Sequence, residues 1–224
     1  MKRTAYALSI LGAALLVLVS YKNYAPISMT EVFGFITGAI CVWLVVKENI
    51  WNWPIGIANE LFFIILFWRA RLFADMGLQF LYVALSFLGW YRWLHGGHGS
   101  SSLRIARIEA HAAVVLSAVG TACTIALTVY LRSIHDAAPF WDALTTVLSV
   151  IAQYLLTRKI LENWHVWIAA DVIYIGLYIY KSLALTALLY LIFLIMCVIG
   201  VREWRASMAS LARSAQLRLE SRTE

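Results

Sequence analysis

The chain has 224 residues, of which 62% are hydrophobic and 13% are charged, and its net charge is +6. Soluble globular domains carry about 25% charged residues, so this composition excludes a water-soluble domain and predicts an integral membrane protein. Lysine and arginine gather in the cytoplasmic loops of such proteins, which explains the positive charge without nucleic-acid binding. The three cysteines lie in apolar segments without C-x-x-C spacing, which predicts neither a disulfide framework nor a metal site.

Eight apolar segments are long enough to cross a bilayer, which takes about 17 to 25 residues per helix. In chain order they are 5–21, 29–46, 52–68, 72–94, 110–131, 139–157, 164–181 and 183–201. The first follows MKRT in the manner of a signal peptide, but no small-x-small cleavage motif comes after it. We therefore expect it to be a retained transmembrane helix.

The basic residues indicate the orientation in the membrane. With eight spans both ends of the chain lie on one side, and thirteen of the 18 lysines and arginines fall on that side. This asymmetry predicts that both termini are cytoplasmic. The polar and basic segment 206–224 is expected to form a solvated or membrane-surface helix.

The chain contains an internal repeat. A shift of 111 residues aligns 31–93 with 142–204 without a gap and superposes two Asn-Trp pairs, two acids and two G-x-x-x-W motifs. Each repeat holds three spans and one span lies between them, so the two repeats enter the membrane from the same side. Parallel repeats of this kind occur in transporters, which bind substrate near the midplane between the repeats.

The predicted fold is therefore an all-α polytopic membrane protein with two parallel three-helix repeats, one linker helix between them (3+1+3) and an extra N-terminal helix. The expected units are the extra helix in 1–28, the first repeat in 29–94, a cytoplasmic loop with the linker helix in 95–138, the second repeat in 139–204 and a basic tail in 205–224.

Polar and aromatic residues form stripes with helical spacing on four of the predicted spans. The sixth span carries Asp142, Thr146, Ser149 and Gln153. The seventh span carries Trp164, Trp167, Asp171, Tyr174, Tyr178 and Lys181; the third carries Trp53, Gly56, Glu60, Phe63 and Phe67 beside Asn52 and Asn59; the fourth carries Asp75, Gln79, Tyr82, Ser86 and Trp90. Polar groups are costly in hydrocarbon and usually face the bundle interior. The stripes predict a shared cavity, and the alternative is polar contact between helices.

The stripes also indicate the chemistry of a ligand. Aromatic faces stack on flat rings and attract cations, and amides and carboxylates bind hydroxyl groups. Acids with few buried basic partners disfavour a phosphorylated ligand, so a nucleoside or a vitamin is expected. Trp93 and Trp204 stand next to arginines and are expected only at the membrane interface.

The sequence argues against two other classes of protein, an enzyme and a channel. An enzyme is not expected, because no G-x-S-x-G or H-E-x-x-H motif occurs and His95 and His98 lie in HGGHG, which is typical of a flexible linker. A channel would need rings of like charges or carbonyl groups along a pore. The paired, aromatic motifs favour a carrier instead.

The runs WNWPIGIANE, LFADMGLQFLY, GWYRW and WHVWIAADVIYIGLYIYK resemble the Pnu vitamin transporters, whose best-known members are the PnuC nicotinamide riboside transporters. The resemblance covers about residues 29–204. It implies a homotrimer in the bacterial cytoplasmic membrane that moves nicotinamide riboside by facilitated diffusion, with no cofactor. A cytoplasmic riboside kinase would trap the product, and thiamine or riboflavin is the alternative substrate. The matched motif positions give the expected binding residues: Asn52, Trp53, Asn59, Asp75, Gln79, Trp164, Trp167, Asp171, Tyr174 and Tyr178.

Overall fold

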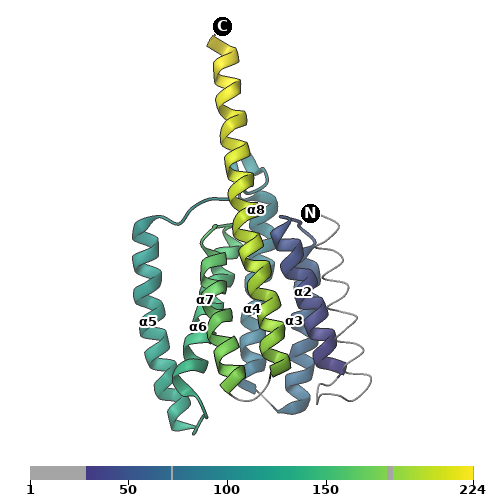
Figure 1. The fold of residues 1–224 in the computed structure, drawn as a ribbon, viewed down its shortest axis with the longest axis vertical. Coiled ribbons are helices and arrows are strands. Elements are labelled where there is room, and N and C mark those ends of the chain that lie inside the picture. The colour runs from purple at the N-terminus through teal and green to yellow at the C-terminus, as the bar shows by residue number, and fades with distance from the viewer. Residues whose placement is uncertain (1–28, 72, 181–183, 224) are drawn as a thin grey trace.

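A computed structural model describes residues 29–71, 73–180 and 184–223 (Figure 1). The predicted span at 5–21 and Lys181 lie outside these described residues. The α-helices are α2 (Met29–Val46), α3 (Asn52–Ala70), α4 (Phe73–His95), α5 (Ala110–Ser133), α6 (Pro139–Thr157), α7 (Asn163–Tyr180) and α8 (Ala184–Thr223). In the described part of the chain there is no β-strand, which confirms the prediction of an all-helical protein.

The helix ends follow from local sequence. Pro139 opens α6 at a position where its missing N–H group is not needed. Glu48 and Lys159, which are 111 residues apart, both take a positive φ of 53° directly after α2 and α6. This left-handed conformation ends a helix, so the chain turns at equivalent positions of the two repeats.

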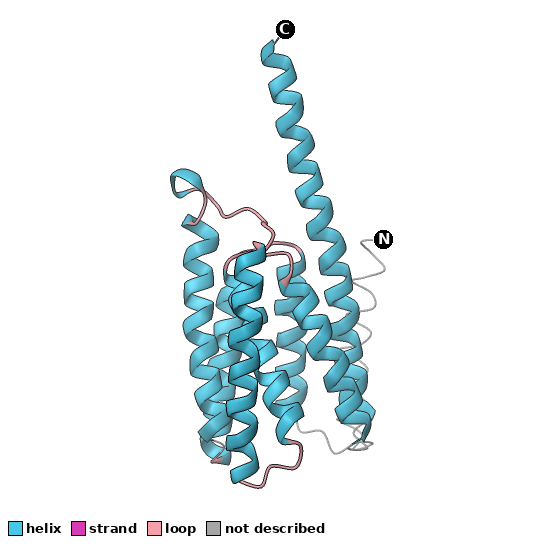
Figure 2. Ribbon diagram, turned by 90° about the vertical axis from the view of Figure 1, so that its left-hand side faces the viewer, coloured by secondary structure: helices cyan, strands magenta, loops and turns pink. Residues whose placement is uncertain are grey.

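The last helix differs from the expectation of a separate tail. α8 runs without a break from the bundle to Thr223 and projects beyond the other helices (Figure 2). Residues 201–223 contain no glycine or proline and are rich in alanine, leucine and arginine, which favour the helical conformation. Nothing in the local sequence therefore stops the helix where it leaves the bundle.

Six helices form a closed ring, in which contacts join α2, α3, α4, α6, α7 and α8 in this order and α8 packs back on α2. α5 stands at the edge of the bundle and packs on α6 (Figure 1). The shift of 111 residues carries α2 to α6, α3 to α7 and α4 to the first part of α8. The two repeats contact each other in two places, α2 with α8 and α6 with α4, and these two contacts are equivalent under the same shift.

Three described helical segments are long and apolar enough to cross a membrane by composition: Ala110–Ser133, Pro139–Thr157 and Thr186–Ser214. α3, α4 and α7 are of similar length, between 18 and 23 residues, but they carry the polar stripes. Their lower hydropathy therefore has a structural reason, because they turn polar groups toward other helices of the ring.

Four tryptophans pack in the core at the end of the bundle from which α8 projects. Trp53 meets Trp93 edge-on at 5.4 Å, and Trp164 meets Trp204 in the same way at 5.4 Å. The exposed fraction of each side chain is 4% or less. The two pairs are related by the 111-residue shift.

Trp93 and Trp204 are buried in the core, so the prediction that they serve only as residues of the membrane interface was wrong. The indole N–H of Trp93 donates to the Leu156 carbonyl oxygen at 3.0 Å, and that of Trp204 donates to the Val45 carbonyl oxygen at 3.1 Å. These carbonyl groups stand near the ends of α6 and α2. Each tryptophan therefore crosses to the other repeat and ties the two repeats together, which their neighbouring arginines did not reveal.

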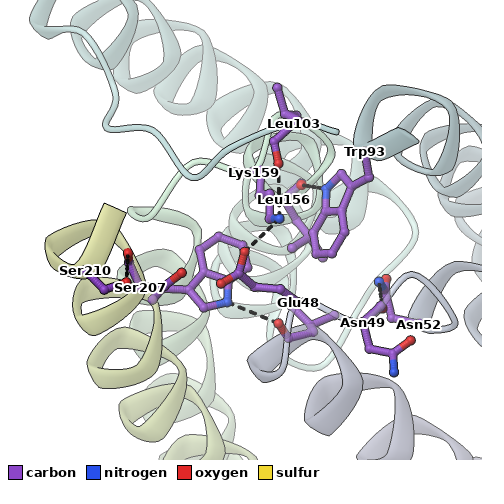
Figure 3. A network of polar contacts seen from close by, with 11 residues as sticks. Glu48, Asn49, Asn52, Trp93, Leu103, Leu156, Lys159, Ser207 and Ser210 are labelled. Atoms are coloured by element: carbon purple, nitrogen blue, oxygen red, sulfur yellow. Dashed lines mark hydrogen bonds and ion pairs between the residues drawn. The ribbon is translucent and has the colours of Figure 1, made fainter. Parts of the chain in front are cut away.

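Glu48 and Lys159 occupy equivalent positions of the two repeats and pair with each other at 2.8 Å (Figure 3). Two equivalent residues can meet only close to the axis that relates the repeats. The Lys159 ammonium group also donates to the Leu103 carbonyl oxygen at 3.2 Å and lies 4.7 Å from the centre of the Trp93 ring. The pair therefore closes this end of the ring over the tryptophans.

Lys159→Met is expected to destabilise the protein by about 1–3 kcal/mol, because it leaves the Glu48 carboxylate and the Leu103 carbonyl oxygen without their cation. The exchange Glu48→Lys with Lys159→Glu should recover part of this loss, because the two positions are equivalent. Thermal unfolding of the purified variants measures both effects. An exchange variant no more stable than Lys159→Met would contradict a pair on the axis.

Candidate functional site

A polar layer crosses the ring at half its depth. Glu60 in α3, Ser86 in α4, Ser149 in α6 and Asp171 in α7 each stand within about two residues of the middle of their helix, which is about 3 Å along the helix axis. Uncompensated polar groups are costly at this depth of a membrane. These four side chains therefore need hydrogen-bond partners, either within the protein or on a ligand.

Glu60 is at the centre of the hydrogen bonds between the repeats. The Ser86 hydroxyl donates to Glu60 Oε1 at 2.8 Å, and the Gln153 amide donates to the Ser86 hydroxyl oxygen at 3.4 Å. Gln153 belongs to α6, so this chain joins the first repeat to the second. Glu60 Oε2 is buried and has no hydrogen-bond partner among the described residues.

Asp171 repeats this arrangement in the second half of the chain. The Cys197 thiol donates to Asp171 Oδ2 at 3.6 Å. Asp171 is equivalent to Glu60, and Cys197 is equivalent to Ser86, by the 111-residue shift. Each repeat therefore places one carboxyl group at mid-depth. Its hydrogen-bond donor on the next helix is a hydroxyl group in the first repeat and the weaker thiol group in the second.

Stacked tyrosines continue the layer toward the far end of α7. Tyr174 and Tyr178 stack at 6.1 Å between ring centres, and Tyr190 of α8 lies 4.6 Å from Tyr174 and 5.2 Å from Tyr178. The Ser149 hydroxyl lies beside both Tyr174 and Tyr82, which comes from α4. Aromatic faces and hydroxyl groups from both repeats thus meet within the ring.

The first repeat offers only apolar rings at the equivalent place. Phe63 and Phe67 stack at 5.7 Å, where the second repeat has Tyr174 and Tyr178. The Asn59 amide donates to Thr37 Oγ1 and, at 3.2 Å, to the Gly34 carbonyl oxygen. Asn59 is therefore occupied between α2 and α3, and the stacked tyrosine rings of the site come from the second repeat.

The structure brings together only some of the ten expected binding residues. Asp171, Tyr174 and Tyr178 lie in the polar layer. Asn52 donates to the Asn49 carbonyl oxygen at 2.7 Å and so caps the turn before α3. Asp75 is exposed in the first turn of α4, at the other end of the bundle.

The remaining expected residues are aromatic or lie outside the layer. Trp53 and Trp164 are buried in the core, with exposed fractions of 2% and 1%, and Trp167 packs against that core. The Trp53 and Trp164 rings press on Gly89 and Gly200. Gln79 is half-buried at the position equivalent to Tyr190. The tryptophans thus have a packing role that the stripe pattern did not distinguish from ligand contact.

Several residues of the layer were not among the ten. Glu60, Tyr82 and Ser86 stood on the predicted stripes, and the match of Glu60 to Asp171 in the repeat was the signal that could have selected it. Tyr190 carried no stripe signal, because its span is apolar on all sides. Its contact with Tyr174 depends on the packing of α8 against α7.

A ring of membrane helices around a polar and aromatic layer at mid-depth is the architecture of a small-molecule transporter. The chain belongs to the family described as nicotinamide mononucleotide transporters, which matches residues 28–206. This membership confirms the resemblance seen in the sequence motifs.

Known relatives are similar over most of their length. The nicotinamide riboside transporter PnuC of Escherichia coli (strain K12) is 28% identical over 204 residues, which cover 80% of this chain and 85% of the relative. The riboflavin/roseoflavin transporter RibM of Streptomyces davaonensis is 28% identical over 181 residues, covering 78% and 84%. A crystal structure of the vitamin B3 transporter PnuC has the same fold, with a TM-score of 0.69 at 23% identity over 90% of both chains.

Proposed function

We propose that this protein carries nicotinamide riboside across the membrane by facilitated diffusion with alternating access. The observation that carries the proposal is the mid-depth layer, which combines the carboxyl groups of Glu60 and Asp171 with the rings of Tyr174, Tyr178 and Tyr190. Aromatic faces bind a flat cationic ring. Carboxylates accept hydrogen bonds from ribose hydroxyl groups. The names of the PnuC relatives agree with this substrate.

The charge of the layer favours the riboside over the mononucleotide. The hydrogen bonds of the layer involve two carboxyl groups, and no described lysine or arginine takes part in them. A phosphate about 6 Å from one carboxylate would raise the energy by about 3 kcal/mol at an effective dielectric constant of 20. A substrate that is cationic at its ring and neutral at its ribose avoids this repulsion.

Binding of purified protein to four compounds by calorimetry tests the proposal. Nicotinamide riboside should bind saturably, and nicotinamide mononucleotide should bind about 100-fold more weakly because of charge repulsion. Thiamine and riboflavin are the matched comparisons. Binding of riboflavin alone would make this chain a riboflavin carrier, as the name of RibM suggests for that relative. No binding of any of the four would remove the proposed function.

Alternating access agrees with the asymmetry between the two ends of the ring. The tryptophan core and the Glu48–Lys159 pair close one end. Rocking of one repeat against the other would open that end and release the substrate, as in other transporters built from repeats. Phosphorylation by a cytoplasmic riboside kinase would then trap it, without physical contact between the two proteins. A carrier of this kind saturates and shows counterflow in liposomes, and a channel does neither.

The proposal extends to the arrangement in the membrane. We place eight spans in a 3+1+3 plan with an extra N-terminal helix, both termini in the cytoplasm and the protein in the bacterial inner membrane as a homotrimer. The equivalence of α2–α4 with α6–α8 and the asymmetry of the basic residues support this plan. Light scattering of the purified protein, corrected for detergent, gives the number of subunits.

A further inference from the structure

A pocket of about 420 Å³ lies outside the helix ring, at the end of the bundle closed by the tryptophans. Its wall comes from the end of α4, the loop before α5, the first turn of α5 and the turn after α6. Three of its lining residues are arginines, Arg92, Arg107 and Arg158, and one is an acid, Glu109. The pocket is therefore a basic site away from the mid-depth layer.

The internal repeat shows that two of these arginines, Arg92 and Arg158, lack the acidic partner found at the equivalent place. Lys47 at the end of α2 pairs with Glu203 of α8 at 3.0 Å. The 111-residue shift carries Lys47 to Arg158, and it carries Arg92 to Glu203. The position that forms an ion pair on one side of the bundle thus holds two like charges on the other side.

The existing contacts of these arginines are with neutral groups. Arg92 donates to Thr157 Oγ1 at 3.4 Å, and Arg158 donates to the Tyr154 hydroxyl at 3.3 Å. Among the described residues, neither arginine nor Arg107 has a carboxylate within ion-pair distance. A guanidinium group has five donors, so most of the donors at this site remain available.

The loop that carries Arg107 is held in place. The Ala106 N–H donates to the Lys159 carbonyl oxygen at 3.1 Å, and the Leu161 N–H donates to the Ala106 carbonyl oxygen at 2.9 Å. The Ile108 N–H donates to Glu162 Oε2 at 2.9 Å, so this nearby carboxylate is engaged by the backbone. The third arginine therefore belongs to a formed wall and not to a loose linker.

We propose that this pocket binds a phosphate group, which takes the place that the Glu203 carboxylate has on the opposite side of the bundle. Arginine suits such a ligand because its planar fork makes paired, charge-assisted hydrogen bonds to phosphate oxygens. A phosphate held by Arg92 of α4 and Arg158 after α6 connects the two repeats. Arg107, in the loop before α5, contributes a third contact to the same phosphate. The source is an anionic lipid headgroup or a soluble phosphate compound.

The thermal stability of purified, delipidated protein tests the site. The probes are inorganic phosphate, dihexanoyl-phosphatidylglycerol and dihexanoyl-phosphatidylcholine at constant ionic strength. The protein should be stabilised saturably by the first, the second or both, and much less by the zwitterionic lipid. Stabilisation by the anionic lipid alone assigns the site to a headgroup, and stabilisation by inorganic phosphate assigns it to soluble phosphate.

Three variants separate this site from general surface charge. The double variant Arg107→Gln with Arg158→Gln should bind the effective probe about tenfold to 100-fold more weakly, because it loses charged hydrogen bonds. Arg104→Gln, an exposed arginine of the same loop that does not line the pocket, is the matched control and should bind normally. Arg92→Glu places a carboxylate next to Arg158, as Glu203 stands next to Lys47. This variant should therefore be as stable without a probe as the parent protein is with one, and added probe should not raise its unfolding temperature.

Retained riboside binding shows that each variant is folded. The proposal is overturned if no probe stabilises the protein, if phosphatidylcholine acts as well as phosphatidylglycerol, or if Arg104→Gln loses as much affinity as the double variant. An Arg92→Glu protein that responds to the probe like the parent protein would overturn it as well.

Discussion

Gly200→Ala and Gly89→Ala are expected to cause large losses of stability, because each adds a methyl group against a tryptophan ring of the core. A Cβ on Gly200 would lie 2.6 Å from Cε2 and Cζ2 of Trp164, and one on Gly89 would lie 2.5 Å from Cζ2 of Trp53. Both rings are fixed in the core, so they cannot move away. Overpacking of this kind costs about 1–3 kcal/mol, and apparent unfolding temperatures of the purified variants should fall accordingly.

Two other glycines provide the control. A Cβ on Gly56 or Gly176 meets no atom within 4 Å, so Gly56→Ala and Gly176→Ala should be neutral or stabilising by up to about 1 kcal/mol, since alanine favours the helix. Combining Gly200→Ala with Trp164→Phe should cost less than the sum of the two changes, because the smaller ring relieves the overlap. Equal effects at all four glycines would contradict the packing described.

Glu60→Gln is expected to weaken riboside binding by about tenfold to 100-fold, the effect of losing a hydrogen bond to a charged group. Glutamine keeps an oxygen for the Ser86 hydroxyl and the same shape, so the protein should remain folded. The variant loses the second carboxylate oxygen, which is buried and has no partner among the described residues. Calorimetry measures the affinity, and counterflow in liposomes measures the transport.

Asp75→Asn is the matched control, because it removes an exposed carboxylate from the end of the same bundle. It should bind the riboside normally. An equal loss in both variants would point to a general effect of charge and would contradict a specific role of Glu60. Normal binding by Glu60→Gln would remove Glu60 from the site, while riboside binding by the parent protein would still support the transport function.

The sequence alone indicated most of the helices. The predicted spans 29–46 and 139–157 agree with α2 and α6 at both ends. Apolar length and turn residues determine such boundaries locally, so they can be read from composition. The end of α8 could not be read in this way, because a helix that leaves the membrane continues as long as its residues favour the helical conformation.

The binding residues were harder to predict than the helices. A stripe with helical spacing tells which residues share a face, but it does not tell which neighbour that face meets. Trp164 and Asp171 stand on one predicted stripe, yet the first packs on Gly200 in the core and the second bonds to Cys197 in the polar layer. The difference depends on the depth at which α8 crosses α7.

The sequence by itself determined the class of protein, the internal repeat and the equivalence of the Glu60 and Asp171 positions, because composition and a 111-residue shift are properties of the chain. Only the tertiary structure decided which equivalent residues meet. Glu48 and Lys159 pair near the axis, whereas Arg92 and Arg158 face one pocket with like charges. Such contacts join residues more than 60 positions apart, and the way the two repeats pack around their common axis is not encoded in the local pattern of either one.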